Sequence, residues 1–311
     1  MLNDFIQLAV IINILAATIR ISTPLLLSAM GELVAERSGV MNLGVEGMMV
    51  FGTFTVWLVV FFGGTTLQAI GMSIIVGALL GWLLGFLVIH MQMDQTVTGL
   101  ALNLLASGIS IYLYRILYAS GESVSVQLLP NISIPLLADI PVVGQILFQQ
   151  SAYTYLAFIS VPVITWILTR TKIGLAIRSA GENPKAVDMK GINVFRVRML
   201  STIFGGIMAG LGGAFLMTVV SSRFLPDMTA GRGWLAIIIV IAGNWKPIRM
   251  VYATLIFAFL GALQITLTTF EIAIPYEFLL IMPYVLALLA LMLSRVRTSQ
   301  PANLAAPYSR E

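Results

Sequence analysis

Residues 67–90 read LQAIGMSIIVGALLGWLLGFLVIH and contain no Asp, Glu, Lys or Arg. A helix needs about 20 mainly apolar residues to cross a hydrocarbon core of roughly 30 Å, so this stretch predicts a membrane span. Small residues four apart let neighbouring helices approach closely, and we interpret such stripes as packing faces, with a sliding surface as the alternative. Glycines at this spacing are Gly77, Gly81 and Gly85, and later Gly206 and Gly210.

Other stretches of the chain have the same apolar character and length. They predict further spans at 5–29, 44–62, 95–118, 151–169, 198–220, 231–244, 248–270 and 276–294. The stretch 231–244 is short, and 30–43 is mixed enough to be a re-entrant or interfacial segment. The sequence therefore predicts an all-α, polytopic transmembrane helical bundle of roughly eight to ten spans, with nine as the central count, in one domain over 1–311.

The composition agrees with a membrane protein. Of 311 residues, 59% are hydrophobic and 10% are charged, whereas a soluble chain is about 25% charged. This excludes a soluble enzyme, a nucleic-acid binder and a disordered scaffold. The net charge of +4 then indicates how loops are oriented against a membrane, because basic residues gather in cytoplasmic loops.

Several kinds of chemistry lack the residues they need. The chain has no Cys and a single His, His90, which excludes a thiolate metal site and a two-histidine zinc site. A phosphate-binding loop needs Gly-Lys followed by Ser or Thr. None of the four lysines has that neighbour: Lys172, Lys185, Lys190 and Lys246. We therefore predict no catalytic residue, no metal site and no cofactor on this chain.

Basic residues are concentrated in one loop. Segment 170–198 holds seven of the 17 Lys and Arg residues, whereas 119–150 has none and carries two acids. The positive-inside rule places 170–198, 245–249 and the C-terminal tail 295–311 in the cytoplasm, and loop 119–150 outside.

Within the basic loop, residues 184–190 are flanked by the start and stop signals of a short helix. Asn183 is suited to the N-cap, Pro184 to the first helical position and Gly191 to the position just past the end. The charged residues of this helix are Lys185, Asp188 and Lys190. We interpret it as a docking site for a cytoplasmic protein; the alternative is a basic loop that only orients the chain.

A second informative stretch, 31–48, reads GELVAERSGVMNLGVEGM. Ionisable groups at membrane depth are costly and usually face a cavity or a partner. Glu46 is the sharpest case, because the glycines around it allow irregular backbone, which is tolerated there only when buried or lining a cavity. For the other charges, Glu32, Glu36 and Arg37, solvation at the interface is the alternative.

Two separated motifs resemble one protein family. They are Gly31-Glu-Leu-Val-Ala-Glu-Arg-Ser-Gly-Val-Met-Asn-Leu-Gly-Val-Glu-Gly-Met-Met49 and the loop from Gly174 through Ile-Arg-Ser-Ala-Gly-Glu-Asn-Pro-Lys to Gly191-Ile-Asn193. The family is the membrane permease subunit of bacterial ABC importers in the branched-chain amino acid/ribose permease superfamily, and the likeness is nearest to its nucleoside (guanosine or purine) branch. The resemblance covers nearly the whole chain, with departures at Leu175-Ala176 and Ala186-Val187.

The resemblance implies a division of labour. Such a permease, in the bacterial cytoplasmic membrane, forms a heterodimer with a second permease, and a separate ABC ATPase binds ATP and Mg²⁺. An extracytoplasmic substrate-binding protein or lipoprotein delivers substrate. The short helix then corresponds to the coupling helix seated in the ATPase, with contact residues Gly181, Glu182, Asn183, Pro184, Lys185, Ala186, Asp188, Lys190 and Gly191.

The implied function is import of nucleosides by alternating access. Asn103 and Ser107 are four apart and share a helix face, so they either line a pathway or hold helices together. The candidate lining residues are Asn42, Glu46, Asn103 and Ser107. Alternatives are a sugar or branched-chain amino acid permease of the same superfamily and, in another class, a secondary transporter, which would need ion-coupling groups or inverted repeats.

Overall fold

The computed structural model describes residues 8–118, 124–269, 281, 285 and 299–309. Within that part of the chain, six helical segments are long and apolar enough to cross a membrane. They are α2 (Leu8–Arg37), α4 (Thr66–Gly85) continued by the π-helical turn η1 (Phe86–His90), α5 (Gln95–Tyr118), α7 (Ala152–Arg170), α10 (Val194–Phe215) continued by η2 (Leu216–Val220), and α12 (Pro247–Thr269).

Among the described residues, two shorter apolar helices also belong to the bundle, α3 (Val45–Phe61) and α11 (Arg232–Ala242). The remaining elements lie between spans: α6 (Val143–Leu147), the two-residue strands β1 (Ile132–Ser133) and β2 (Gln149–Gln150), which pair antiparallel, and helices α8 (Lys172–Glu182) and α9 (Pro184–Met189). The predicted span 276–294 lies outside the described residues except at Ile281 and Val285. The total of nine spans therefore stays a prediction.

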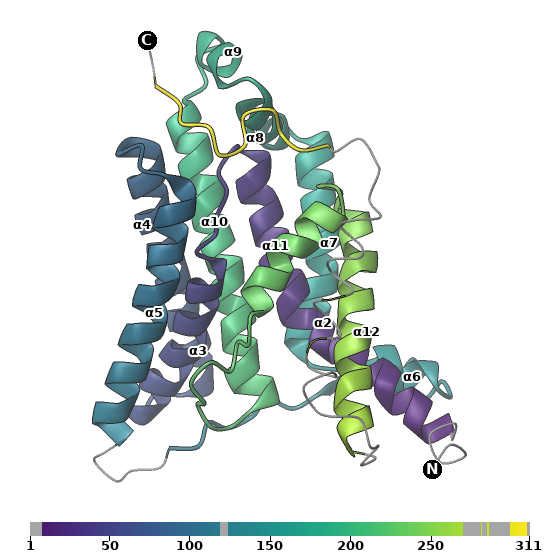
Figure 1. Cartoon of the computed structure of the whole chain (residues 1–311). Coiled ribbons are helices and arrows are strands. Elements are labelled where there is room, and N and C mark those ends of the chain that lie inside the picture. Colours follow the sequence, from purple (N-terminus) through teal and green to yellow (C-terminus); the bar gives the residue numbers. More distant parts are fainter. Residues whose placement is uncertain (1–7, 119–123, 270–280, 282–284, 286–298, 310–311) are drawn as a thin grey trace.

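The loops separate to the two ends of the bundle. Figure 1 shows α8, α9 and segment 299–309 at one end, and α6 at the other, near the start of α2. The basic loop and the loop without basic residues are thus at opposite ends. We call the end that carries α8 and α9 the cytoplasmic end, following the positive-inside rule.

Helix α2 differs from the predicted first span. It continues without interruption to Arg37, so residues 30–37 are not a separate re-entrant or interfacial segment. Glu32 and Glu36 are each 1% exposed, and the interpretation of these two as solvated side chains is wrong. A sequence window stops at their charges because it cannot see the neighbouring helices that enclose them.

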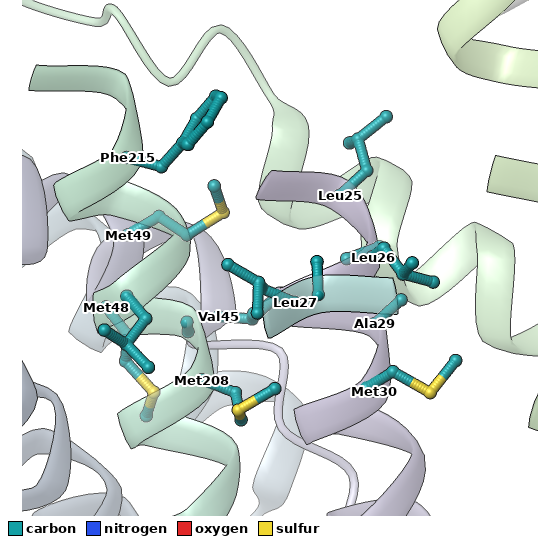
Figure 2. Close-up of a cluster of buried hydrophobic side chains, with 14 of the residues drawn as sticks. Leu25, Leu26, Leu27, Ala29, Met30, Val45, Met48, Met49, Met208 and Phe215 are labelled. Carbon is teal, nitrogen blue, oxygen red and sulfur yellow. The ribbon is translucent and has the colours of Figure 1, made fainter. Parts of the chain in front are cut away.

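The centre of α2 is the core of the molecule. Consecutive residues from Ser22 to Glu36 are all buried, since α10, α12, α11 and α7 pack against α2. Figure 2 shows its apolar side chains facing those of α3 and α10, including Met49, Met208 and Phe215. This part of α2 has no face left for lipid or water, because its neighbours cover it on every side.

The two glycine stripes pack against each other, joining α4 to α10. A Cβ added at Gly77 would lie 2.4 Å from the carbonyl oxygen of Gly206, and one added at Gly206 would lie 2.2 Å from that of Gly77. The backbones therefore touch where the side chains are absent, which confirms the stripes as packing faces.

Helices α3 and α11 both begin inside the bundle. Residues 38–44 lead from the end of α2 back along it, where the Asn42 N–H donates to Glu32 Oε1 at 2.9 Å before α3 begins. Residues 221–230 return from the end of η2 to Gly231, the N-cap of α11, which has the left-handed conformation with φ +74°. Figure 1 shows α11 starting partway along the bundle. Each is thus a discontinuous helix with its N-terminus among other helices.

Candidate functional site

At the cytoplasmic end, α8 and α9 form a capped pair of short helices. Asn183 Oδ1 accepts a hydrogen bond from the Ala186 N–H at 3.0 Å, Pro184 is the first residue of α9, and Gly191 follows with φ +78°. Asn193 then caps α10 by accepting from the Arg196 N–H at 3.0 Å. The helix predicted over 184–190 is therefore present over Pro184–Met189, with the predicted cap.

A groove of about 750 Å³ runs along α8 and α9. Apolar side chains, Leu175, Val187 and Ile192, form part of its lining, and Lys172, Arg178, Lys190 and Glu182 add charge. A mixed, mainly basic surface with an apolar floor fits a protein partner, because such interfaces combine buried apolar contacts with a polar rim.

The predicted contact residues fall into two groups. Glu182, Asn183, Lys185, Lys190 and Gly191 are exposed, and Ala186 and Asp188 are half-buried. Gly181 and Pro184 are buried instead. A Cβ at Gly181 would lie 2.4 Å from the Arg37 carbonyl oxygen, so this glycine seats the end of α8 against the end of α2.

Inside the bundle, Glu46 holds the start of α11. Its Oε1 accepts from Thr229 Oγ1 at 2.6 Å and from the Gly231 N–H at 3.0 Å, and its Oε2 accepts from the Gly233 N–H at 2.6 Å. The first N–H groups of a helix have no partner within the helix and carry a partial positive charge, so a carboxylate there is stabilising.

Asn103 plays the same role for α3. It brings its side chain from α5 to the start of α3, where Oδ1 accepts from the Gly47 N–H at 2.7 Å and Nδ2 donates to the Leu43 carbonyl at 2.7 Å. Asn42 is fully buried, and its Oδ1 accepts from the Gly44 N–H at 3.0 Å. In this conformation these two amides, like the Glu46 carboxylate, bind backbone at the junction of α3 and α11.

Ser107 lies one turn beyond Asn103 on α5 and is half-buried. Sequence reasoning missed the partners of Glu46, namely Thr229, Gly231 and Gly233. The run Thr-Ala-Gly-Arg-Gly over 229–233 is a signal for them, since glycine at a helix start permits both the left-handed turn and the close approach of another chain segment.

A second carboxylate contact joins α2 to the turn between α11 and α12. The Trp245 indole Nε1 donates to Glu36 Oε2, and Arg37 Nη2 donates to the Trp245 carbonyl at 2.7 Å. Asn244 and Trp245 both have positive φ, 52° and 53°, so the turn is strained in order to place the indole beside Glu36.

At the opposite end, polar side chains of α2 face the loop that carries α6. A polar pocket of about 230 Å³ lies between them, with lining residues that include Asn13, Arg20, Asn131, Gln145, Gln149 and Gln150. Arg20 is exposed on the surface of this single chain. Among the described residues, no three His, Cys, Asp or Glu side chains lie close enough together to hold a metal ion.

Several permease proteins are similar to the chain over most of its length. A guanosine ABC transporter permease protein, NupQ of Bacillus subtilis, is 35% identical over 315 residues, which is 98% of each chain. A nucleoside ABC transporter permease protein, NupC of Lactococcus lactis, is 34% identical over 88% of this chain and 89% of its own. A putative glucose ABC transporter permease protein, TsgC13 of Haloferax volcanii, is 36% identical over 84% of this chain and 80% of its own.

No solved structure matches the chain significantly. Residues 14–293 match the family described as "Branched-chain amino acid transport system / permease component". Together with the long apolar helices, this match identifies a multi-pass membrane protein. The chain belongs to the family of permease components of branched-chain amino acid type transport systems.

Proposed function

We propose that this chain is the permease subunit of an ATP-driven importer that moves nucleosides inward by alternating access. The observation that carries the proposal is end-to-end similarity, over 98% of both chains, to a permease named for guanosine. The similarity to a nucleoside permease from a second organism supports the same substrate class.

The energy for transport comes from a separate ABC ATPase subunit that binds ATP and Mg²⁺. The groove along α8 and α9 supports this assignment, because it presents an apolar floor with exposed Lys185 and Lys190 beside it. Acidic residues on the ATPase would then be steered to this surface. Closure of the ATPase on ATP displaces α9, and the displacement passes to α8 and α10, which flank it.

The pathway opens at the junction of α3 and α11. Discontinuous helices at membrane depth are typical of substrate sites in transporters. Glu46 and Asn103 hold the two helix starts in this conformation, and exchange of their hydrogen bonds would let α11 tilt away from α3. The Glu46 carboxylate already occupies the N-terminal amides of α11, which weighs against binding the carboxylate of an amino acid there and favours an uncharged substrate.

A second permease, as a heterodimer, completes the pathway, and an extracytoplasmic binding protein delivers the substrate to the segment 124–150. The outward polar face of α2 supports the pairing. An exposed Arg20 with Asn13 is costly against lipid, but not against a second subunit or a water-filled passage.

A sugar is the second candidate substrate. The similarity to a putative glucose permease, 36% identity over 84% of this chain, is its support. Like a nucleoside, a sugar is uncharged and rich in hydroxyl groups, so the junction at Glu46 does not separate the two. The shorter shared length of that relative makes it the weaker candidate.

The test is uptake by proteoliposomes that contain this chain with a second permease, an ABC ATPase and a binding protein from the same organism. Radiolabelled guanosine, glucose and leucine are offered separately, with ATP supplied on the ATPase side. We expect guanosine uptake that requires ATP and persists when an ionophore collapses the proton gradient. Glucose or leucine uptake without guanosine uptake would contradict the substrate, and uptake driven by a proton gradient without ATP would contradict the ATP-driven mechanism.

A further inference from the structure

Segment 299–309 crosses the whole cytoplasmic end of the bundle, as the yellow trace beside α8 in Figure 1 shows. We call this segment the strap. Its first residue is held on both sides: the Ser299 N–H donates to Asn244 Oδ1 at 2.6 Å, and Arg37 Nη1 donates to the Ser299 carbonyl at 3.3 Å. The strap thus begins on the end of α2 and the turn between α11 and α12.

The middle of the strap binds the end of α8, next to the residue that caps α9. The Asn303 N–H donates to the Gly181 carbonyl at 2.8 Å, and Asn303 Nδ2 donates to the Glu182 carbonyl at 2.6 Å. Two residues on, the Ala305 N–H donates to the Gly39 carbonyl at 3.1 Å. Carbonyls at the end of a helix have no partner within it, so the strap supplies donors where α8 lacks them.

The end of the strap inserts a side chain between three helices. Tyr308 is 8% exposed and packs with Ala180 of α8, Val187 of α9 and Val194 of α10, in an apolar cluster separate from the main core. Its ring centroid lies 5.5 Å from that of Phe195. Without the Tyr308 ring, the fully buried members of the cluster would be Ala180, Val187 and Val194, with a cavity where the ring had been.

A buried charge fixes the same region. Arg198 is 2% exposed; its Nε donates to the Ser38 carbonyl at 3.2 Å and its Nη1 to the Ala306 carbonyl at 2.9 Å. The guanidinium therefore joins α10, the residues after α2 and the strap. A buried charge that loses an acceptor is strongly destabilising, which keeps the strap in place.

Helix α9 cannot hold its own position. It has six residues, and helices shorter than about 12 residues are marginal in water without packing. Its buried side chains are Pro184 and Val187, and Val187 packs in the Tyr308 cluster. The strap is therefore part of the packing that attaches α9 to α8 and α10.

We infer that the strap is the element that fixes α9 to α2 and α10 throughout the transport cycle, with Tyr308 as its positioning residue. A force applied to a loosely held α9 would rotate that helix alone. With the strap in place, the same force moves α2 and α10, which carry the core. The inference rests on the proposed function, because it assumes that the ATPase acts on α9.

The test uses the complete reconstituted importer. Four variants are compared with the unchanged chain: Tyr308→Ala, Tyr308→Phe, a chain ending at residue 298, and Ser309→Ala. The last is the matched control, because it alters an exposed strap residue. The measurements are the ATP hydrolysis stimulated by substrate-loaded binding protein, the substrate uptake, and the KM and maximal rate of that uptake.

We expect Tyr308→Ala and the shortened chain to lower uptake per ATP hydrolysed at least about fivefold, within the range usual for coupling between sites. The KM for substrate should not change, because the strap lies far from the external loops. Tyr308→Phe should restore coupling, since the ring fills the cluster, and Ser309→Ala should behave as the unchanged chain. Normal uptake per ATP in both Tyr308→Ala and the shortened chain would overturn the inference.

A crosslink keeps the test independent of folding defects. The chain has no Cys, and the Ala302 N–H donates to Glu182 Oε2 at 3.3 Å, so Glu182→Cys with Ala302→Cys places one thiol on each side of this contact, within reach of a short bifunctional thiol reagent. We expect the crosslinked double variant to retain the uptake that the same variant shows before crosslinking, because the strap does not leave α8 during transport. Loss of uptake on crosslinking, or no crosslink, would overturn the inference. If the unchanged importer shows no ATP-dependent uptake, the proposed function is contradicted. If the unchanged importer is active and the strap variants couple as well as it does, only the inference about the strap is contradicted.

Discussion

The carboxylate of Glu46, in the first turn of α3, accepts a hydrogen bond from the Gly233 N–H at 2.6 Å, in the first turn of α11. Two residues 187 positions apart thus join the starts of two discontinuous helices. The contact is close on both sides: a Cβ at Gly233 would lie 2.5 Å from Glu46 Cα. The space between the two helix starts therefore accommodates the Glu46 carboxylate only because residue 233 is a glycine.

Glu46→Ala is expected to lower uptake strongly. The buried Gly233 N–H, the half-buried Gly231 N–H and the Thr229 hydroxyl would lose their acceptor, and each unsatisfied buried donor costs about 1–3 kcal/mol. Uptake and the midpoint of thermal unfolding in detergent are the measurements. Glu46→Gln keeps one oxygen acceptor and should lie between the two. A Glu46→Ala protein with normal uptake and stability would show that the junction does not matter.

Gly233→Ala should be as damaging as removal of Glu46, because the added methyl group meets the α3 backbone. The matched control is Gly108→Ala in α5, where an added Cβ has no atom within 4 Å. Alanine there should be neutral or stabilising by up to about 1 kcal/mol, its advantage over glycine within a helix. Equal unfolding midpoints for the two variants would contradict the close approach at Gly233.

Gly77→Ala is expected to separate α4 from α10 and reduce the yield of folded protein. The new methyl would lie 2.4 Å from the Gly206 carbonyl oxygen, a contact that backbone movement alone can relieve. Overpacking of this kind costs about 1–3 kcal/mol. Gly71→Ala, on the same helix but with no atom within 4 Å, is the control. Size-exclusion profiles in detergent report the outcome, and two identical profiles would be evidence against the packed stripe.

The double variant Lys185→Glu with Lys190→Glu should lose ATPase binding and transport while it inserts normally. Reversal of both exposed charges turns electrostatic attraction to an acidic surface into repulsion. Lys246→Glu with Arg249→Glu reverses two exposed charges at the same end but outside α9, and it should retain ATPase binding. Co-purification of the ATPase is the readout. Full co-purification with the Lys185/Lys190 variant would remove α9 from the interface.

Trp245→Phe should destabilise the cytoplasmic end. The aromatic ring is kept, but buried Glu36 loses the indole donor, at a cost of about 1–3 kcal/mol. Trp234→Phe, at a half-buried position in α11, provides the control for loss of an indole. Thermal unfolding followed by tryptophan fluorescence distinguishes them, and an unfolding midpoint for Trp245→Phe equal to that of the control would argue against the Glu36 contact.

The sequence by itself determined the local features. Apolar length decided that α4 and α10 span a membrane, the glycine spacing predicted their packing faces, and the run from Asn183 to Gly191 predicted α9 with its cap. These features depend on residues near one another in the chain, so a sequence window contains their physical cause. The two motifs also carried the resemblance that predicted the family.

Tertiary structure alone decided how distant residues meet. From sequence, the charges of Glu32 and Glu36 are interpreted as the end of a membrane span. In the structure α2 continues through both residues, because other helices and Trp245 enclose them. Glu46 was singled out, but its partners at 229–233 were not, since nothing local links residues so far apart. The strap residue Tyr308 is an ordinary aromatic in sequence. Its importance comes from lying between α8, α9 and α10, a position that folding of the whole chain creates.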